Sequence, residues 1–352
     1  MTKYKELREK VKRLFIGIDL HRRQWHVTIL GESEVIFSGS IPGTWEALRQ
    51  LLERFHGVPM TAVYEAGYFG YWLHDRLVEY GAECIITPPS LIPQEYGNRV
   101  KTDRRDSRKL AWFLSKGLLK NIWVPSLEQR YHRQVLRRRQ QLVQERIRVQ
   151  NRIKAELRFH GVEIPGNELT WSKRYLKNLL SYQWADHWMQ ESFHRLLDHY
   201  TALQGQIDQQ TKLLVELSQS DDYRCSVDLL RNIPSIGVIG AMSVLLELFD
   251  VRRFRHAEQI AAYVGLTPSQ YSSAEHIRMG RITGIGKNAL RALLVEASWV
   301  LVSKDPAMAK IYDRIKIRAG GKRAIVAVAR HLLIRIRRVL WDRTPYVIGL
   351  SN

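Results

Sequence analysis

Apolar and polar positions change period along the chain, and the first part alternates short strand-like runs with helical patterns. Three runs rich in β-branched and aromatic residues come first, and the complete order is β-β-β-α-β-α-β-α. This order predicts an α/β domain over residues 1–125. The expected strands are LFIGIDL (14–20), QWHVTIL (24–30), EVIFSGS (34–40), TAVYEAG (61–67) and AECIITPP (82–89), and the first two expected helices are TWEALRQLLERFH (44–56) and YWLHDRLVEYG (71–81).

The apolar period becomes helical after this domain. From Gln129 to His160 the apolar residues fall close to one stripe, and Pro165 and Gly166 break the pattern before a second helical stretch up to about residue 220. We therefore expect a helical, coiled-coil region over residues 126–225. The stripe consists of Leu136, Leu142, Val143, Ile147, Ile153 and Leu157.

The last region, residues 226–352, combines helical patterns with glycine-containing turns and predicts an all-α C-terminal domain. NIPSIGVIGA (232–241) is typical of the hairpin in a helix-hairpin-helix element, whose glycines let backbone N–H groups approach phosphate. TGIGKNAL (283–290) repeats the pattern and adds Lys287. KRAIVAVARHLLIRIRRVLWDRTPY (322–346) predicts one basic amphipathic helix, which closes this domain with arginines outside or, alternatively, lies on a membrane surface.

Charge adds a polyanionic partner to this picture. The 352 residues carry 55 Lys and Arg against 35 Asp and Glu, a net charge of +20, as expected of a protein that binds nucleic acid. Ten of these cations lie between Gln129 and His160. Arginine forks suit phosphate, so we expect this helix to follow a nucleic-acid backbone, although a solvated face that only aids solubility would carry the same charges. The candidate contacts are Arg137, Arg138, Arg139, Arg146, Arg148 and Lys287.

Cysteine usage and the N-terminus indicate a cytoplasmic protein. Cys84 and Cys225 are the only cysteines and lie in different regions, so neither a disulfide framework nor a zinc-ligand spacing is present. The first residues, MTKYKELREKVKR, are charged and lack the apolar core of a signal peptide. Since no apolar run of about 18 residues occurs, we expect no membrane span.

Four acidic residues stand in an order that suits metal-dependent chemistry on nucleic acids. Asp19 and Glu65 lie at or near the ends of expected strands, while Asp103 and Asp106 are spaced i, i+3 and project from one helical turn. Carboxylate oxygens suit hard cations, and two Mg²⁺ ions about 3.5–4 Å apart can activate an attacking oxygen and stabilise a leaving one. We expect these acids to bind Mg²⁺, whereas strand-end acids and helix caps are the non-catalytic interpretation.

A second candidate centre is LTPSQYSSAEHIRMGR (266–281), which holds serines among cations. A serine hydroxyl is a weak nucleophile unless a base, a positive field or a metal activates it. Chemistry alone does not separate the three serines, and turn or capping serines would give the same pattern. The serines are Ser269, Ser272 and Ser273, and the nearby cations are His276, Arg278 and Arg281.

These segments carry a resemblance to a known family. IGIDLH, YEAG and KTDRRDSRKLA resemble, in order and interval, the N-terminal catalytic domain of the DEDD insertion-sequence transposases, the bridge-RNA-guided recombinases. AAYVGLTPSQYSSAEHIRMGRITGIGKNALRALLVEASW (261–299) resembles that family's C-terminal block, so the likeness covers most of the chain. The resemblance implies a ribonuclease H-like, RuvC-like fold for residues 1–125. It also implies catalytic, metal-binding roles for Asp19, Glu65, Asp103 and Asp106.

The resemblance further implies a covalent mechanism. Ser273 matches the family's nucleophilic serine, with Ala274 where glycine is usual and Ser272 as the alternate. The implied activity is that of a transposase, which recombines DNA for its own mobile element through a transient phosphoserine link. The implied partners are the element's ends and target DNA, a non-coding bridge RNA that pairs with both, and further copies of the chain, which form a dimer and then a tetramer with a composite site.

Two other function classes fit the same residues. In a metal-dependent junction resolvase or nuclease, the four acids would hydrolyse phosphodiesters and the C-terminal serine would be structural. In a non-catalytic nucleic-acid-binding protein, the acids would only pair with the many arginines. Three outcomes distinguish these classes. A trapped protein–DNA adduct supports the serine recombinase, metal-dependent cutting without an adduct supports the nuclease, and tight binding without either supports the non-catalytic protein.

Overall fold

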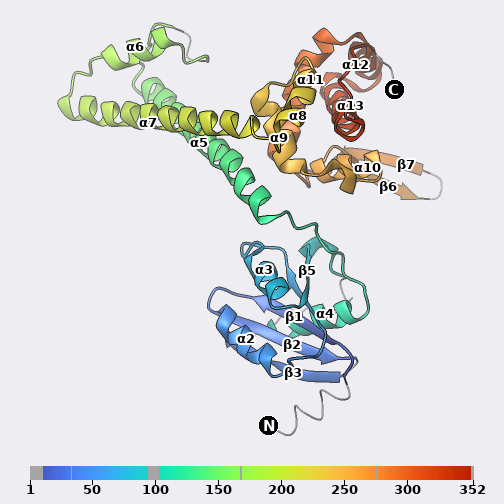
Figure 1. The fold of residues 1–352 in the computed structure, drawn as a ribbon. Helices are drawn as coiled ribbons and strands as arrows, with labels where there is room; N and C mark the ends of the chain where they lie inside the picture. Colours follow the sequence, from blue (N-terminus) through green and yellow to red (C-terminus); the bar gives the residue numbers. More distant parts are fainter. Residues whose placement is uncertain (1–10, 33, 94–102, 167–168, 274–275, 350–352) are drawn as a thin grey trace. The chain divides into compact units, whose positions relative to one another are not determined.

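The computed structural model describes residues 11–32, 34–93, 103–166, 169–273 and 276–349, and divides the chain into two compact units. The first unit is Met1–Val124 and the second is Pro125–Asn352. Figure 1 labels the helices and strands of both units. Within the described ranges, no helix is both long and apolar enough to span a membrane.

The first unit is a five-stranded mixed sheet with helices on both faces, and its strands and helices follow the order β-β-β-α-β-α-β-α that the sequence predicts. The strand order is β3-β2-β1-β4-β5, with β1 antiparallel to β2, β2 antiparallel to β3, and β1, β4 and β5 parallel. This arrangement is consistent with a ribonuclease H-like domain. The elements are β1 (Leu14–Leu20), β2 (Gln24–Gly31), β3 (Glu34–Pro42), α2 (Trp45–Glu53), β4 (Met60–Glu65), α3 (Trp72–Glu79), β5 (Glu83–Thr87), η1 (Pro89–Leu91) and α4 (Asp103–Ser115).

Strand alternation sorts the side chains of the sheet into two layers. Ile16 and Ile18 of β1 join the core that α2 and α3 cover, whereas Phe15 of β1 and Val63 of β4 pack with Leu110 of α4 on the other face (Figure 1). Because successive side chains of a strand point to opposite faces, every second residue from Phe15 and from Val63 faces α4. This parity decides where the two strand-end acids point.

Helix α4 lies directly on the backbone of β1. A Cβ at Gly17 would stand 2.1 Å from the carbonyl oxygen of Ser107 and 2.5 Å from the backbone nitrogen of Ala111, so only glycine permits this approach. A buried hydrogen bond between the hydroxyls of Thr28 and Ser107, 2.8 Å long, ties the helix to β2. The close contact brings the first turn of α4 over the end of β1.

The second unit begins with a helical arm, which we define as α5 (Leu127–Phe159), α6 (Lys173–Ser181) and α7 (His187–Ser218). α5 and α7 run side by side and antiparallel (Figure 1). They lie within the two long stretches that the sequence predicts to be helical. Four of the six residues of the expected apolar stripe are buried. Ile147 is exposed and Val143 is half-buried, whereas Val149, outside the expected stripe, is buried. A capping box at Ser126 starts α5.

The rest of the second unit is a mainly helical domain with one β-hairpin. Leu136 of α5 and Leu214 of α7 belong to its core, so the arm is rooted in it. The division of this unit at residues 225/226 stays a prediction. The elements are α8 (Arg224–Arg231), α9 (Val238–Leu248), η2 (Val251–Arg253), α10 (Ala257–Val264), β6 (Pro268–Ser273), β7 (His276–Ile282), α11 (Asn288–Lys304), α12 (Pro306–Ala319) and α13 (Gly321–Asp342).

The structure corrects one of the two expected hairpins and the all-α assignment of this domain. Residues 232–237 join α8 to α9, as the first pattern predicts. Residues 283–287 instead follow strand β7, so the second turn is a strand-to-helix connection and the helix-hairpin-helix prediction is wrong there. The strands were missed because the polar run PSQYSS carries no apolar alternation. The two strands, β6 and β7, pair with each other in one hairpin, in which Ser273 lies opposite His276.

A buried polar cluster joins α12, α13 and the C-terminal segment. The Asp305 carboxylate, 0% exposed, accepts hydrogen bonds from Tyr346 and from the backbone N–H groups of Ala307 at 2.8 Å and Gly349 at 3.2 Å. Arg335, buried on α13, pairs with it at 3.2 Å. Burial alone would raise the pKa of Asp305, but the hydrogen bonds and the guanidinium together hold that pKa below its usual value.

We expect Asp305→Ala to lower the free energy of unfolding by about 3–5 kcal/mol, because it leaves the buried Arg335 without its carboxylate. Since the folded-state pKa is lowered, the stabilisation by Asp305 is present above its ordinary pKa and is lost as the pH falls through the lowered value. Urea unfolding followed by tryptophan fluorescence measures both effects. Asp342→Ala, which breaks only a surface pair with Arg338, is the matched control and should cost about 1 kcal/mol or less.

Candidate active site and nucleic-acid interface

The two strand-end acids lie side by side on the face of the sheet that α4 covers. β1 and β4 are parallel neighbours and pair Ile18 with Tyr64, so Asp19 and Glu65 directly follow a paired position. Both acids share the parity of the residues that face α4. The fold therefore directs two carboxylates to one edge of the sheet, at the carboxyl ends of its central strands.

The other two acids occupy the first turn of α4. Asp103 is exposed and Asp106 half-buried, and the helix begins at Asp103. The contact of α4 with Gly17 and Thr28 holds this turn near the end of β1. The i, i+3 spacing thus has the helical setting that the sequence predicts.

A histidine that sequence reasoning missed bridges two of these acids. His21 Nε2 lies 3.4 Å from Asp19 Oδ2 and 3.4 Å from Asp103 Oδ1. The candidate ligand atoms of these three residues all lie within 4.8 Å of one another. The available signal was its position in the sequence, two residues after Asp19 and directly after the end of β1.

The carboxylates repel one another, and the electrostatics of Asp19 record it. Burial raises the pKa of Asp19, the charge of His21 opposes this shift, and the charges of Asp103 and Asp106 raise the pKa further, with a net increase. His26 pairs with Asp19 across β1 and β2, and burial lowers its pKa against the pull of Asp103. A cation would relieve this accumulation of negative charge.

The four predicted acids are therefore not equally close. The structure brings Asp19, Asp103 and Asp106 into electrostatic contact, and places Glu65 at the end of the neighbouring strand, half-buried and outside the compact group around His21. The donor set of carboxylate oxygens with one imidazole fits a divalent cation. The residues present thus satisfy what a metal site at this edge requires.

The serine candidates lie on the hairpin β6–β7. Ser273 ends β6 and pairs with His276, and Ser272 pairs with Ile277. Ser269 differs from them, because its hydroxyl donates to the carbonyl of Arg281 at 3.1 Å across the hairpin. This bond gives Ser269 a structural role. Ala274 lies outside the described residues, as do the side chains of Ser272, Ser273, His276 and Arg278.

Arg291 holds the base of this hairpin together. Its guanidinium donates to the carbonyls of Val264 at 3.3 Å and Gly265 at 3.4 Å before β6, and to that of Ile285 at 3.4 Å after β7. Gly265 has φ +84°, and a Cβ there would stand 2.0 Å from the Ile285 carbonyl oxygen. The hairpin that carries Ser273 thus starts from a fixed base.

Two of the predicted nucleic-acid contacts, Arg137 and Lys287, are half-exposed and share one buried partner. Glu247 of α9 is buried, with a side chain 7% exposed, and it pairs with Arg137 at 3.4 Å and with Lys287 at 3.5 Å. Lys287 also stands over the ring of Tyr263. These two cations therefore pair with a buried carboxylate, and their contact with nucleic acid stays a prediction.

The remaining predicted arginines of α5 divide into two kinds. Arg138 and Arg148 are exposed. Arg139 and Arg146 are half-buried along α7, where Arg139 Nε donates to Thr211 and Arg146 Nη1 donates to Gln204. Residues seven positions apart share one face of a helix, so Arg139 and Arg146 both lie on the face of α5 that packs against α7.

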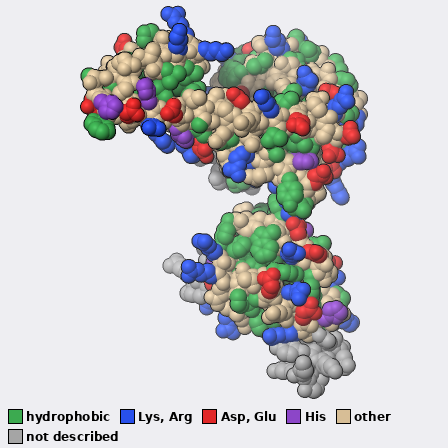
Figure 2. All heavy atoms as spheres, turned by 60° about the vertical axis from the view of Figure 1, so that its left-hand side comes forward, with side chains coloured by type: hydrophobic (Ala, Val, Ile, Leu, Met, Phe, Trp, Pro, Cys, Tyr) green, Lys and Arg blue, Asp and Glu red, His purple; other side chains and the backbone are tan. Residues whose placement is uncertain are grey.

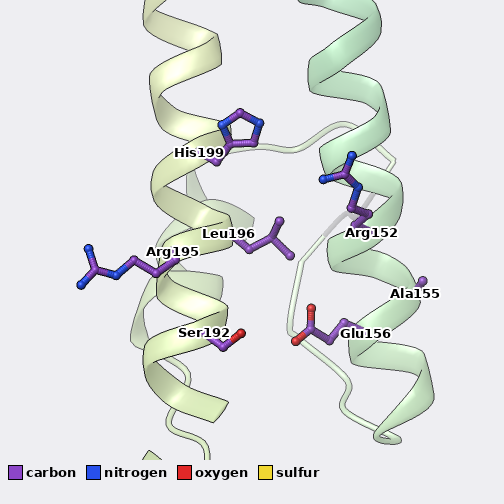
Figure 3. A pocket seen from close by; sticks show the side chains of 7 residues that line it. All are labelled: Arg152, Ala155, Glu156, Ser192, Arg195, Leu196 and His199. Carbon is purple, nitrogen blue, oxygen red and sulfur yellow. The ribbon is translucent and has the colours of Figure 1, made fainter. Parts of the chain in front are cut away.

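A cavity of about 580 Å³ opens between α5 and α7 at a different place along the arm. Figure 3 shows Glu156 and Ser192 facing each other across it, Arg152 and His199 on its two walls, and Arg195 pointing away. Its charges are mixed. In the view of Figure 2, Lys and Arg side chains are likewise interspersed with Asp and Glu over the visible surface.

Comparisons with known proteins agree with the geometry. A family model for DEDD transposases of the IS110 type matches residues 16–161, and a second, described as the transposase IS116/IS110/IS902 family, matches residues 227–313. The four candidate acids fall within the first match, and Ser273 falls within the second.

Curated relatives cover most of the chain. Transposase y4qE of Sinorhizobium fredii is 31% identical over 292 residues, which are 81% of this chain and 71% of that protein. The transposase for insertion sequence element IS1533 from Leptospira borgpetersenii is 22% identical over 340 residues, or 95% of this chain and 97% of that protein. The transposase for IS1111A from Coxiella burnetii is 24% identical over 283 residues, or 75% and 73%.

Proposed function

We propose, from the premise that the chain belongs to the IS116/IS110/IS902 family of transposases, that it is the site-specific DNA recombinase of its own insertion sequence. The single observation that carries the proposal is the meeting of Asp19, Asp103 and Asp106 at one edge of the sheet, beside the strand end of Glu65. A group of carboxylates of this kind can hold a divalent cation for chemistry on phosphodiesters.

The acids would hold the cation, which we propose to be Mg²⁺. When bound, the cation supplies Lewis-acid stabilisation of charge on phosphate oxygens. Asp19 and Glu65 would approach it from the sheet, and Asp103 and Asp106 from α4. The pKa of Asp19 is raised by burial and further by the charges of Asp103 and Asp106, and a bound cation would offset both effects, which supports this assignment.

Ser273 would carry out strand cleavage. Its Oγ attacks the phosphorus, an Oγ–P bond forms while a P–O bond to the deoxyribose breaks, the hydroxyl proton leaves the serine, and the released deoxyribose oxygen takes up a proton. Attack by a deoxyribose hydroxyl on the phosphoserine then reverses these bond changes and joins the exchanged strand. The position of Ser273 at the end of β6, on a hairpin fixed by Arg291, supports its use as the nucleophile.

The partners of the proposed reaction are the element's ends and target DNA, with a bridge RNA as guide and a homo-oligomer as the active form. The net charge of +20 supports a nucleic-acid partner. Base pairing by an RNA would supply specificity while the protein contacts backbone shape and charge.

Sequencing the RNA that co-purifies with the protein tests guidance. The expected result is one defined non-coding RNA that maps to the flank of the element and contains segments complementary to donor and target DNA. A random pool of cellular RNA would contradict guidance and leave the DNA chemistry standing.

One observation favours a second candidate function. The carboxylate group lies entirely within the first unit, Met1–Val124, so metal-dependent hydrolysis does not require the serine hairpin. A resolvase-like nuclease would therefore cut branched DNA without forming a protein–DNA bond.

A further inference from the structure

Among the described residues, two arginines on the inner face of the arm, Arg139 and Arg146, have no ion pair. Arg139 and Arg146 lie seven residues apart on α5, so both point along the same face of the helix. Each is half-buried beside α7. Their guanidinium groups interact with each other electrostatically, which, together with burial, lowers the pKa of Arg139.

Their protein partners are neutral. Arg139 Nε donates to the hydroxyl of Thr211 at 2.8 Å, and Arg146 Nη1 donates to the side-chain oxygen of Gln204 at 2.7 Å. The amide nitrogen of Gln204 in turn donates to the exposed carboxylate of Asp208 at 2.9 Å, and no ion pair joins Asp208 to either arginine among the described residues. Within the described part of the chain, Arg146 Nε is buried without a hydrogen-bond partner.

This arrangement costs stability in the free protein. Partial removal of two like charges from water is unfavourable, and neutral partners do not offset the repulsion between them. Arg137, two residues before Arg139, differs from this pair, because a carboxylate, that of Glu247, lies 3.4 Å from it. An uncompensated pair of this kind marks a place where an external anion would bind.

We propose that Arg139 and Arg146 form a binding site for the phosphodiester backbone of a nucleic-acid strand that crosses the α5–α7 seam. Each guanidinium has five N–H donors in a planar fork, and the contacts with Thr211 and Gln204 use one donor each. Seven residues of α-helix span about 10 Å, so the pair suits two phosphates of one strand rather than one small anion. The proposal rests on the proposed nucleic-acid function and names the contact within it.

The test uses the full-length protein and two labelled probes of one sequence, a single-stranded RNA and a duplex DNA. The double variant Arg139→Gln, Arg146→Gln should bind the preferred probe about a hundredfold more weakly, since each charged hydrogen-bonding group contributes about tenfold. Its salt dependence should flatten by about 1.4 in log–log slope for RNA or about 1.8 for DNA, which identifies the strand. The free variant should melt at the same temperature as the wild type or higher.

The matched control removes the same charge from the same helix at exposed positions. Arg138→Gln, Arg148→Gln should weaken binding less, because screened surface charges contribute less. The double lysine variant of Arg139 and Arg146 keeps the charge but loses the fork, and should recover only part of the affinity.

Unchanged binding in the Arg139, Arg146 double variant, or a loss no larger than that of the exposed pair, would overturn the site while the proposed function stands. A lower melting temperature of the free variant would also overturn it, because it would assign the pair to arm packing. If the wild type binds neither probe, the proposed function fails together with the site.

Discussion

Replacing any one of Asp19, Glu65, Asp103 or Asp106 by alanine is expected to reduce recombination by about a hundredfold to a thousandfold while the protein stays folded. Removal of one oxygen ligand disturbs both the charge and the geometry of a metal site, and a lost electrostatic contact of this kind costs about two to three orders of magnitude in rate. The measurement is recombination between plasmids that carry the element's ends and its target, quantified by sequencing the junctions.

A stability measurement separates loss of chemistry from loss of fold. Because the folded-state pKa of Asp19 is raised, the metal-free protein should lose stability as the pH rises through that raised value. Asp19→Asn should remove this loss and melt higher than the wild type in the presence of EDTA. Glu79→Gln, which only breaks a surface pair with Arg76, is the control and should change neither activity nor melting.

Added Mg²⁺ should raise the melting temperature of the wild type and not that of Asp19→Asn. Full recombination by any two of the four alanine variants would contradict the metal-site assignment. So would equal stabilisation of the wild type and Asp19→Asn by the metal ion.

The second large effect is expected at Ser273. Ser273→Ala should abolish the covalent protein–DNA intermediate and recombination but leave nucleic-acid binding unchanged, since only the attacking oxygen is removed. Binding is measured by titration with labelled DNA, and the intermediate by denaturing electrophoresis of protein incubated with nicked DNA.

Two neighbouring serines serve as controls. Ser272→Ala should retain the intermediate at a reduced level. Ser269→Ala should also retain it, although the hairpin loses the hydrogen bond to the Arg281 carbonyl, which is worth about 1 kcal/mol. Loss of the intermediate in Ser272→Ala, with an active Ser273→Ala, would move the nucleophile by one residue.

The first unit was predictable because local signals agree with tertiary structure there. The run LFIGIDL forms β1 over Leu14–Leu20, and the parity of its side chains sends Asp19 toward α4. The i, i+3 pair Asp103 and Asp106 also required only helical periodicity. Mixed α/β structure is confirmed, and divalent-metal chemistry agrees with the family.

Other features depend on contacts that one sequence does not display. Tertiary packing places His21 between the carboxylates of Asp19 and Asp103. It also pairs Arg137 with Glu247, which lies 110 positions away in the chain. Ile147 has the apolar character of the stripe but stands on its exposed side, because α5 places Val149 at the seam instead. The polar strand β6 is paired only through its neighbour β7.

Mass spectrometry of a trapped adduct tests the central claim most directly. Suicide DNA substrates nicked beside the cleavage site would accumulate the covalent intermediate, and proteolysis would yield a peptide that retains a nucleotide remnant. The modified residue is expected to be Ser273. Metal-dependent cleavage that proceeds without any modified peptide would contradict phosphoserine chemistry and assign the four acids to direct hydrolysis.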